Sequence, residues 1–172
     1  MLYRRQQGLS LTETTKVVMP KVIVDHEVEY QSVLVAFEDD KYSGEAISTA
    51  ARLAARRRRG IHVLVTITVP ANAPIDAIMP EAESKAQAAI DSARVRGGRR
   101  VTGHAEKVRA GEAGRRIVSE ARDIHAAAVV MTLPPKRAGS SLFGRTLETV
   151  LAERPCRVII DSSRHEGAKR AA

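Results

Sequence analysis

The chain has 172 residues, and its 28 basic side chains against 20 acidic ones give a formal net charge of +8. This length suits one domain with a core of its own. A single cysteine excludes an intramolecular disulfide framework and indicates a reducing compartment. No apolar run approaches the ~18 residues that a membrane span requires, and the beginning does not read as a signal peptide. We therefore expect a soluble, cytoplasmic chain.

The core of this chain must consist mainly of small and aliphatic side chains. Hydrophobic residues make up 44% of the sequence but aromatic residues only 3%, and tryptophan is absent. This composition favours a buried parallel sheet beneath alanine-rich helices. The excess positive charge lies in residues 31–160, because residues 1–30 are neutral and residues 161–172 carry only +1. It would attract phosphates, polyanions or anionic lipid headgroups without choosing among them.

Residues 1–30 read as a connector, because they show little helical periodicity. Val22, Val24 and Val28 indicate a short extended segment within it. We expect a single domain over residues 31–161 and a polar, mobile tail over residues 162–172.

The first half of this domain alternates strand, helix, strand and helix. The apolar run 32–37 predicts a strand buried on both faces. Alanines at helical spacing over residues 46–54 predict a helix that ends in a run of arginines and Gly60. Residues 61–69 predict the second strand. Apolar residues from Ile75 to Ala93 then form one stripe, which predicts a helix over this range.

The second half continues the alternation. Residues 101–108 predict a more polar strand near a sheet edge, followed by a helix that Gly111 opens. Residues 126–132 predict a central strand, and the loop 133–141 separates it from a final helix and strand within residues 143–160. Five strands that alternate with helices predict an α/β fold, with a parallel sheet covered by helices on both faces.

Common catalytic and phosphate-binding motifs are missing from the sequence. It has no P-loop, no G-x-G-x-x-G fingerprint, no H-E-x-x-H, no paired C-x-x-C and no G-x-S-x-G elbow. We expect Cys156 to be a buried, apolar residue. The histidines are scattered without ligand spacing, so we expect neither catalysis nor metal binding from them. They are His26, His62, His104, His125 and His165.

The carboxyl ends of the strands are the predicted ligand site, because open parallel sheets bind ligands where the strand order reverses. The loop after the fourth strand is basic through Lys136 and Arg137, and Arg145 follows at a helix start. Backbone N–H groups at a helix start, next to arginine, can bind an anion. From the residues alone, a flexible loop with solvated cations is an equal alternative.

The acidic residues 38–40 after the first strand also have two interpretations. They could receive ligand hydroxyl groups or a magnesium ion, or they could cap the following helix. We assign capping to Asp40 and the ligand role to Glu38. The basic run 56–59 is more typical of a solvated helix end, and without interleaved aromatic residues we expect no nucleic-acid binding.

Several segments match one known pattern. They are residues 33–38, 61–69, 108–112 and 128–131, and residues 144–158, which follow a G-[ST]…V-L…P-C-x-V spacing. Through them the chain resembles the universal stress protein family. The resemblance implies a five-stranded parallel sheet in the order 3-2-1-4-5. It also implies a homodimer formed through strand five, at Val158, Ile159 and Ile160.

ATP-binding members of that family carry G-x-x-G-x9-G-[ST] after strand four, and this sequence departs from the motif. The two early glycine positions fall on Thr132 and Pro135, or one residue earlier in the other alignment. Gly144 alone is retained, and Arg145 replaces the usual serine or threonine. Proline supplies no N–H group and restricts the backbone, so we expect the usual triphosphate cradle to be impaired.

The resemblance places a ligand site at these loops, with Glu38 where the family has an aspartate near the nucleoside. The candidate binding residues are Ala36, Phe37, Glu38, Asp39, Val65, Arg109, Gly111, Thr132, Lys136, Arg137, Gly139, Ser140, Ser141, Gly144, Arg145 and Thr146.

Residues 3–14 and 29–32 carry a second resemblance, to the segment after the last membrane helix of bacterial amino-acid permeases that end in a stress-protein domain. Together the two resemblances predict a regulatory domain, not an enzyme, attached to a membrane transporter. It would sense an adenine nucleotide, with cyclic di-adenylate (cyclic di-AMP) as one candidate. The alternatives are a free-standing stress protein that binds and slowly hydrolyses ATP, and a ligand-free dimerisation module.

Overall fold

The computed structural model of the chain describes residues 32–39, 42–55, 59–133 and 143–162. The connector and nearly all of the tail lie outside the described residues. So do Asp40, the arginines 56–58 and five of the candidate binding residues, which are Lys136, Arg137, Gly139, Ser140 and Ser141.

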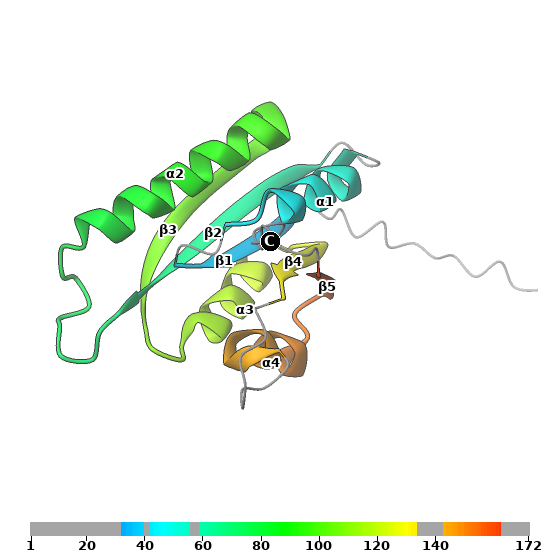
Figure 1. Ribbon diagram of the computed structural model, residues 1–172. Helices are drawn as coiled ribbons and strands as arrows, with labels where there is room; N and C mark the ends of the chain where they lie inside the picture. Colours follow the sequence, from blue (N-terminus) through cyan, green and yellow to red (C-terminus); the bar gives the residue numbers. More distant parts are fainter. Residues whose placement is uncertain (1–31, 40–41, 56–58, 134–142, 163–172) are drawn as a thin grey trace, which may run out of the picture.

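Five parallel strands form one sheet in the order β3-β2-β1-β4-β5 (Figure 1). This confirms the strand order that the family resemblance implies, the edge position of β3 and the interior position of β4. The order reverses between β1 and β4, which are paired from Val33↔Ala128 to Ala36↔Met131. The strands are β1 (Ser32–Glu38), β2 (Gly60–Val69), β3 (Val101–Arg109), β4 (Ala128–Thr132) and β5 (Arg157–Asp161).

Helices cover both faces of the sheet, as predicted. Those on one face are α1 (Gly44–Ala55) and α2 (Pro80–Gly97), and those on the other are α3 (Ala113–Asp123) and α4 (Gly144–Glu153) (Figure 1). A short 3-10 turn, η1 (Gly98–Arg100), follows α2. No helix among the described residues is both long and apolar enough to cross a membrane.

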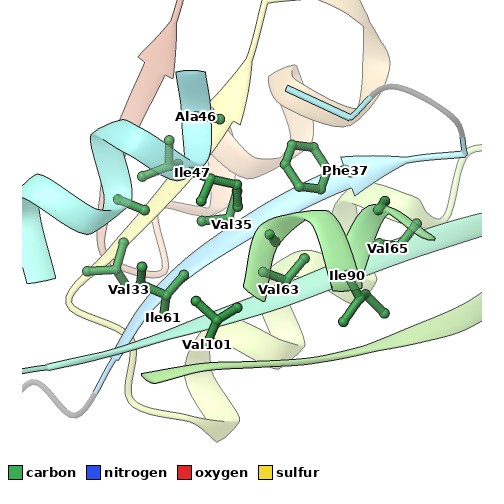
Figure 2. Close-up of a cluster of buried hydrophobic side chains, with 14 of the residues drawn as sticks. Val33, Val35, Phe37, Ala46, Ile47, Ile61, Val63, Val65, Ile90 and Val101 are labelled. Atoms are coloured by element: carbon green, nitrogen blue, oxygen red, sulfur yellow. The ribbon is translucent and has the colours of Figure 1, made fainter. Parts of the chain in front are cut away.

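The strand β1 is buried on both faces, which explains its continuous apolar run. Val33, Val35 and Phe37 face α1 and α2 and pack against residues such as Ile47 and Ile90 (Figure 2). The alternate residues of β1 enter the second cluster, beneath α3 and α4. Successive side chains of a strand point to opposite faces, so a doubly covered strand needs apolar residues throughout.

The helix α2 begins at Pro80, so the expectation that it begins at Ile75 is wrong. Prolines explain the difference. Residues 70–79 form turns in which the Ala73 and Ala77 N–H groups donate to the carbonyls of Pro70 and Pro74. Met79 precedes Pro80 and, with φ of −126° and ψ of 70°, lies outside the helical region, which proline disfavours for the residue before it. Ile78 is therefore 86% exposed instead of continuing the apolar stripe.

Other boundaries also differ from the expectations. Gly111 lies in a turn with φ of 82°, and α3 begins two residues later, at Ala113. Gly60 is the first residue of β2 and not the cap of α1. The β4 strand begins at Ala128 and not at the predicted residue 126. Cys156, which was expected to be buried, is only half-buried. Burial nevertheless raises the pKa of the Cys156 thiol, so it remains protonated.

The α1 helix has a side-chain cap among the described residues. The Ala46 N–H donates to Ser43 Oγ at 3.3 Å, three residues away, which is the ordinary N-cap arrangement. The predicted cap, Asp40, lies outside the described residues.

Candidate functional site

Asp39 is fixed at the carboxyl edge of the sheet by bonds to β2. Its N–H donates to the Thr66 carbonyl at 2.7 Å, and its φ of 48° turns the chain sharply at the end of β1. Its carboxylate accepts the Thr68 N–H at 2.8 Å through Oδ1 and the Thr68 hydroxyl at 3.3 Å through Oδ2. The Asp39 carboxylate therefore has a defined position, which a binding group requires.

A cavity of about 560 Å³ lies between Asp39 and the first turns of α2. Its described lining combines apolar and charged groups: Asp39, Met79, Pro80, Glu81, Ala82 and Lys85. This volume lies within the range of small-molecule sites. Met79 and Ala82 offer an apolar wall for a planar ring, Asp39 can accept a hydroxyl donor, and Lys85 can pair with an anion. We refer to this space as the Asp39 cavity.

Two basic residues of β3 bind the segment that leads from β2 to the wall of the Asp39 cavity. Arg109 Nη1 donates to the carbonyls of Pro70 and Ala73, at 2.9 and 2.6 Å. Lys107 Nζ donates to the Ala77 carbonyl at 2.8 Å and pairs with Glu83 at 2.6 Å. This contact lowers the pKa of the Glu83 carboxyl, with a further contribution from the Met79 N–H. Arg109, a predicted ligand residue, thus positions the segment between β2 and α2.

Glu38 and Thr146 meet at the point where the strand order reverses. The Thr146 hydroxyl donates to Glu38 Oε1, which ties the end of β1 to the first turn of α4. The structure therefore brings together two predicted site residues that lie 108 positions apart in the chain. This contact already occupies one oxygen of the Glu38 carboxylate.

Arg145 lies beside the turn after β3 and not beside Asp39. Its guanidinium covers Gly111 so closely that a Cβ at Gly111 would lie 3.0 Å from it. There it lines a second groove, of about 410 Å³, between this turn and α4. The described lining of that groove is Ala110, Gly111, Glu112, Arg115, Arg145, Thr149, Ala152 and Glu153. Arg145 and the Asp39 cavity thus lie at different places along the carboxyl ends of the strands.

The remaining described candidates fall into two groups. Ala36, Phe37 and Val65 are buried, and their side chains contribute to the hydrophobic core. Thr132 is half-buried at the end of β4, and Gly144 begins α4 with φ of 72°. A φ in this region favours glycine, which explains why Gly144 suits this helix start.

Three residues at this site, Thr68, Met79 and Lys85, were not predicted from the sequence. Thr68 has a weak signal, because it is a second polar residue, two positions after Thr66, near the end of a mostly apolar strand. Lys85 and Met79 have none, since they reach the cavity only because α2 begins at Pro80 and runs past Asp39.

The comparisons with known proteins agree with this architecture. The sequence model of the universal stress protein family matches residues 29–161. The chain belongs to the universal stress protein family. Among curated proteins, no match to the chain is found.

Solved stress-protein structures share the fold. A universal stress protein from Archaeoglobus fulgidus superimposes with a TM-score of 0.60 and is 22% identical, over 76% of this chain and 98% of that one. A structure of the universal stress protein from the same organism in complex with dAMP gives a TM-score of 0.57 at 22% identity, over 76% and 97%. A universal stress protein in complex with cAMP gives 0.55 at 19% identity, over 77% and 97%.

Proposed function

We propose that this stress-protein domain is a regulatory module that binds an adenine nucleotide in the Asp39 cavity. The observation that carries the proposal is the cavity itself: about 560 Å³ at the carboxyl edge of the sheet, with Asp39 held in place by Thr68. Ligands of open parallel sheets bind at this edge. Two solved stress proteins of the same fold hold dAMP and cAMP, which supports an adenine nucleotide as the ligand class.

Each part of an adenine nucleotide has a chemically suitable partner in the cavity. The adenine ring would pack on Met79 and Ala82, since thioether and methyl groups suit a flat aromatic surface. The ribose hydroxyls would donate to the Asp39 carboxylate. Lys85 would pair with a phosphate, because it is the basic residue among those that line the cavity.

Isothermal titration calorimetry with AMP, ATP, cyclic AMP and cyclic di-adenylate tests this proposal. We expect at least one of the four to bind, and Lys85→Ala to weaken its affinity about tenfold through loss of one charge-assisted contact. Arg99→Ala is the matched control, because Arg99 is equally exposed but lies beyond the opposite end of α2. Absence of binding by all four nucleotides at high micromolar concentration would refute the proposal, as would equal losses in the two variants.

We further propose that two copies of the domain associate through β5. This strand pairs with β4 on one side and is the last strand of the sheet, and Val158, Ile159 and Ile160 are only half-buried. An edge with unpaired backbone groups and apolar side chains is a template for a second strand.

Replacing Val158 with lysine should convert the dimer to a monomer in sedimentation equilibrium, because a charge would have to be buried at the pairing edge. Ala105→Lys serves as the control, since Ala105 is exposed on β3 at the opposite edge of the sheet. A wild-type chain that is monomeric at high micromolar concentration would contradict this association.

The transporter context rests on the resemblance of residues 3–14 and 29–32 to permease linkers. We propose that the domain regulates an attached amino-acid permease, with nucleotide binding favouring one arrangement of the domain through differential contacts. A continuous reading frame upstream of Met1 that encodes a series of hydrophobic spans would support this, and a stop codon directly upstream would overturn it.

A further inference from the structure

Two histidines and a glutamate converge on the α3 side of the sheet, away from both cavities described above. His62 of β2, His104 of β3 and Glu120 of α3 place one ligand atom each within 4.8 Å of one another. The two imidazole rings have centroids 5.3 Å apart. The expectation that the histidines are scattered is therefore wrong for this pair. The pairing of β2 with β3 brings them together. His62 lies opposite Thr102, and His104, two residues after Thr102, faces the same side of the sheet because side chains alternate along a strand.

His62 has the orientation of a metal ligand. Its Nδ1 lies 3.0 Å from the Thr102 hydroxyl, which can accept the Nδ1–H and so hold the ring. Metal-binding histidines usually carry such a partner on the nitrogen that does not bind the metal. Burial, partly offset by Glu120, lowers the pKa of the His62 imidazole.

The other nitrogen of His62 faces the carboxylate of Glu120. Nε2 has almost no solvent contact and lies 3.0 Å from Glu120 Oε1. In the tautomer that donates Nδ1–H to Thr102, the Nε2 lone pair faces a carboxylate oxygen of Glu120, and in the other tautomer Nε2–H donates to that oxygen. In the first tautomer, a cation between the two atoms would make a favourable contact with each.

The Glu120 carboxylate is also held in a fixed position, by Arg116. Its side chain is only 8% exposed, and its Oε2 accepts Arg116 Nη2 at 2.7 Å, which leaves Oε1 directed at His62. Arg116 also binds Glu106 at 2.5 Å. The two carboxylates and the one guanidinium carry a formal net charge of −1 beside the two imidazole rings. A divalent cation is therefore electrostatically favoured despite Arg116.

We propose that His62, His104 and Glu120 form a binding site for a divalent transition-metal ion, with zinc as the best fit. Imidazole nitrogens and one carboxylate oxygen are a set of three protein ligands that zinc prefers, with water in the fourth position. The His104 side chain is 42% exposed, so an ion and this water can enter from solvent. The ion would link the edge strand β3 to β2 and to α3.

Metal binding to the full chain, freed of metal with EDTA, tests this site. We expect one Zn²⁺ per chain and a rise in melting temperature of about 5 °C at a 100-fold excess over Kd. Titration with Co²⁺ should give visible absorption of the intensity typical of four-coordinate sites. His104→Ala should reduce the Zn²⁺ affinity at least about tenfold and abolish the cobalt spectrum, because it removes one of three ligands.

His125→Ala is the matched control, because His125 is an exposed histidine just beyond α3 and should leave binding unchanged. His62→Ala removes a more buried ring, so His104→Ala, on an exposed side chain, decides the question if His62→Ala fails to fold. A wild-type chain with neither a cobalt spectrum nor a zinc-induced rise in melting temperature overturns the proposal. Equal zinc affinity of wild type and His104→Ala overturns it as well, since the bound ion would then lie elsewhere.

Discussion

Replacing Phe37 with alanine should lower the free energy of unfolding by about 3–5 kcal/mol. Phe37 is 2% exposed in β1, and its ring lies 5.3 Å from that of Tyr42. It projects into the cluster beneath α1 and α2 (Figure 2). The chain contains only two phenylalanines and no tryptophan. Alanine would therefore leave a cavity beside Tyr42 that the packed neighbours fill only in part. Urea unfolding, followed by circular dichroism, measures the loss.

Phe37→Leu is the matched variant, because it keeps most of the apolar volume and should cost no more than about 1.5 kcal/mol. A loss below 1.5 kcal/mol for alanine itself would show that the ring is not the core element that its burial indicates. The Asp39 cavity should respond too, since Glu38 and Asp39 follow Phe37 directly and depend on the position of β1.

The strands of this fold could be predicted from sequence because each interior strand is buried on both faces. Residues 33–37 form an apolar run and residues 61–67 a mostly apolar one that contains His62 and Thr66. Short runs of this kind predict buried strands. The polar strand β3 was correctly placed at an edge for the same reason. The strand order did not follow from the pattern, because alternation leaves it open, and came instead from the family resemblance.

Helix boundaries were less predictable where local chemistry opposed the apolar pattern. The stripe that begins at Ile75 continues into α2, yet Pro74 and Pro80 divide it into turns and a helix. Periodicity describes which residues would share a helix face, but not whether the backbone can form that helix. Proline decides the second question.

The candidate site was predictable at the level of loops and not of side chains. Topology alone brings Glu38 to the start of α4, and Thr146 meets it there. Arg145, its neighbour, turns instead to Gly111, where the missing Cβ leaves room for the guanidinium. The histidine pair depended on the register between β2 and β3, which no local pattern in either strand specifies.

Replacing Gly114 with valine should destabilise the domain by about 3 kcal/mol, because α3 and α4 approach each other closely at this point. A Cβ at Gly114 would lie 2.6 Å from Thr149 Cβ and 2.9 Å from the Thr146 carbonyl oxygen.

Gly114→Ala should also destabilise, although alanine in place of glycine within a helix ordinarily stabilises by about 1 kcal/mol. Ser119→Ala, at an exposed position of the same helix, gives the ordinary stabilising sign and is the control. Thermal unfolding of the three variants distinguishes the effects, and a Gly114→Ala domain more stable than wild type would disprove the close contact. Because α4 carries Thr146, displacement of this helix should also break the Thr146–Glu38 hydrogen bond at the reversal of the strand order.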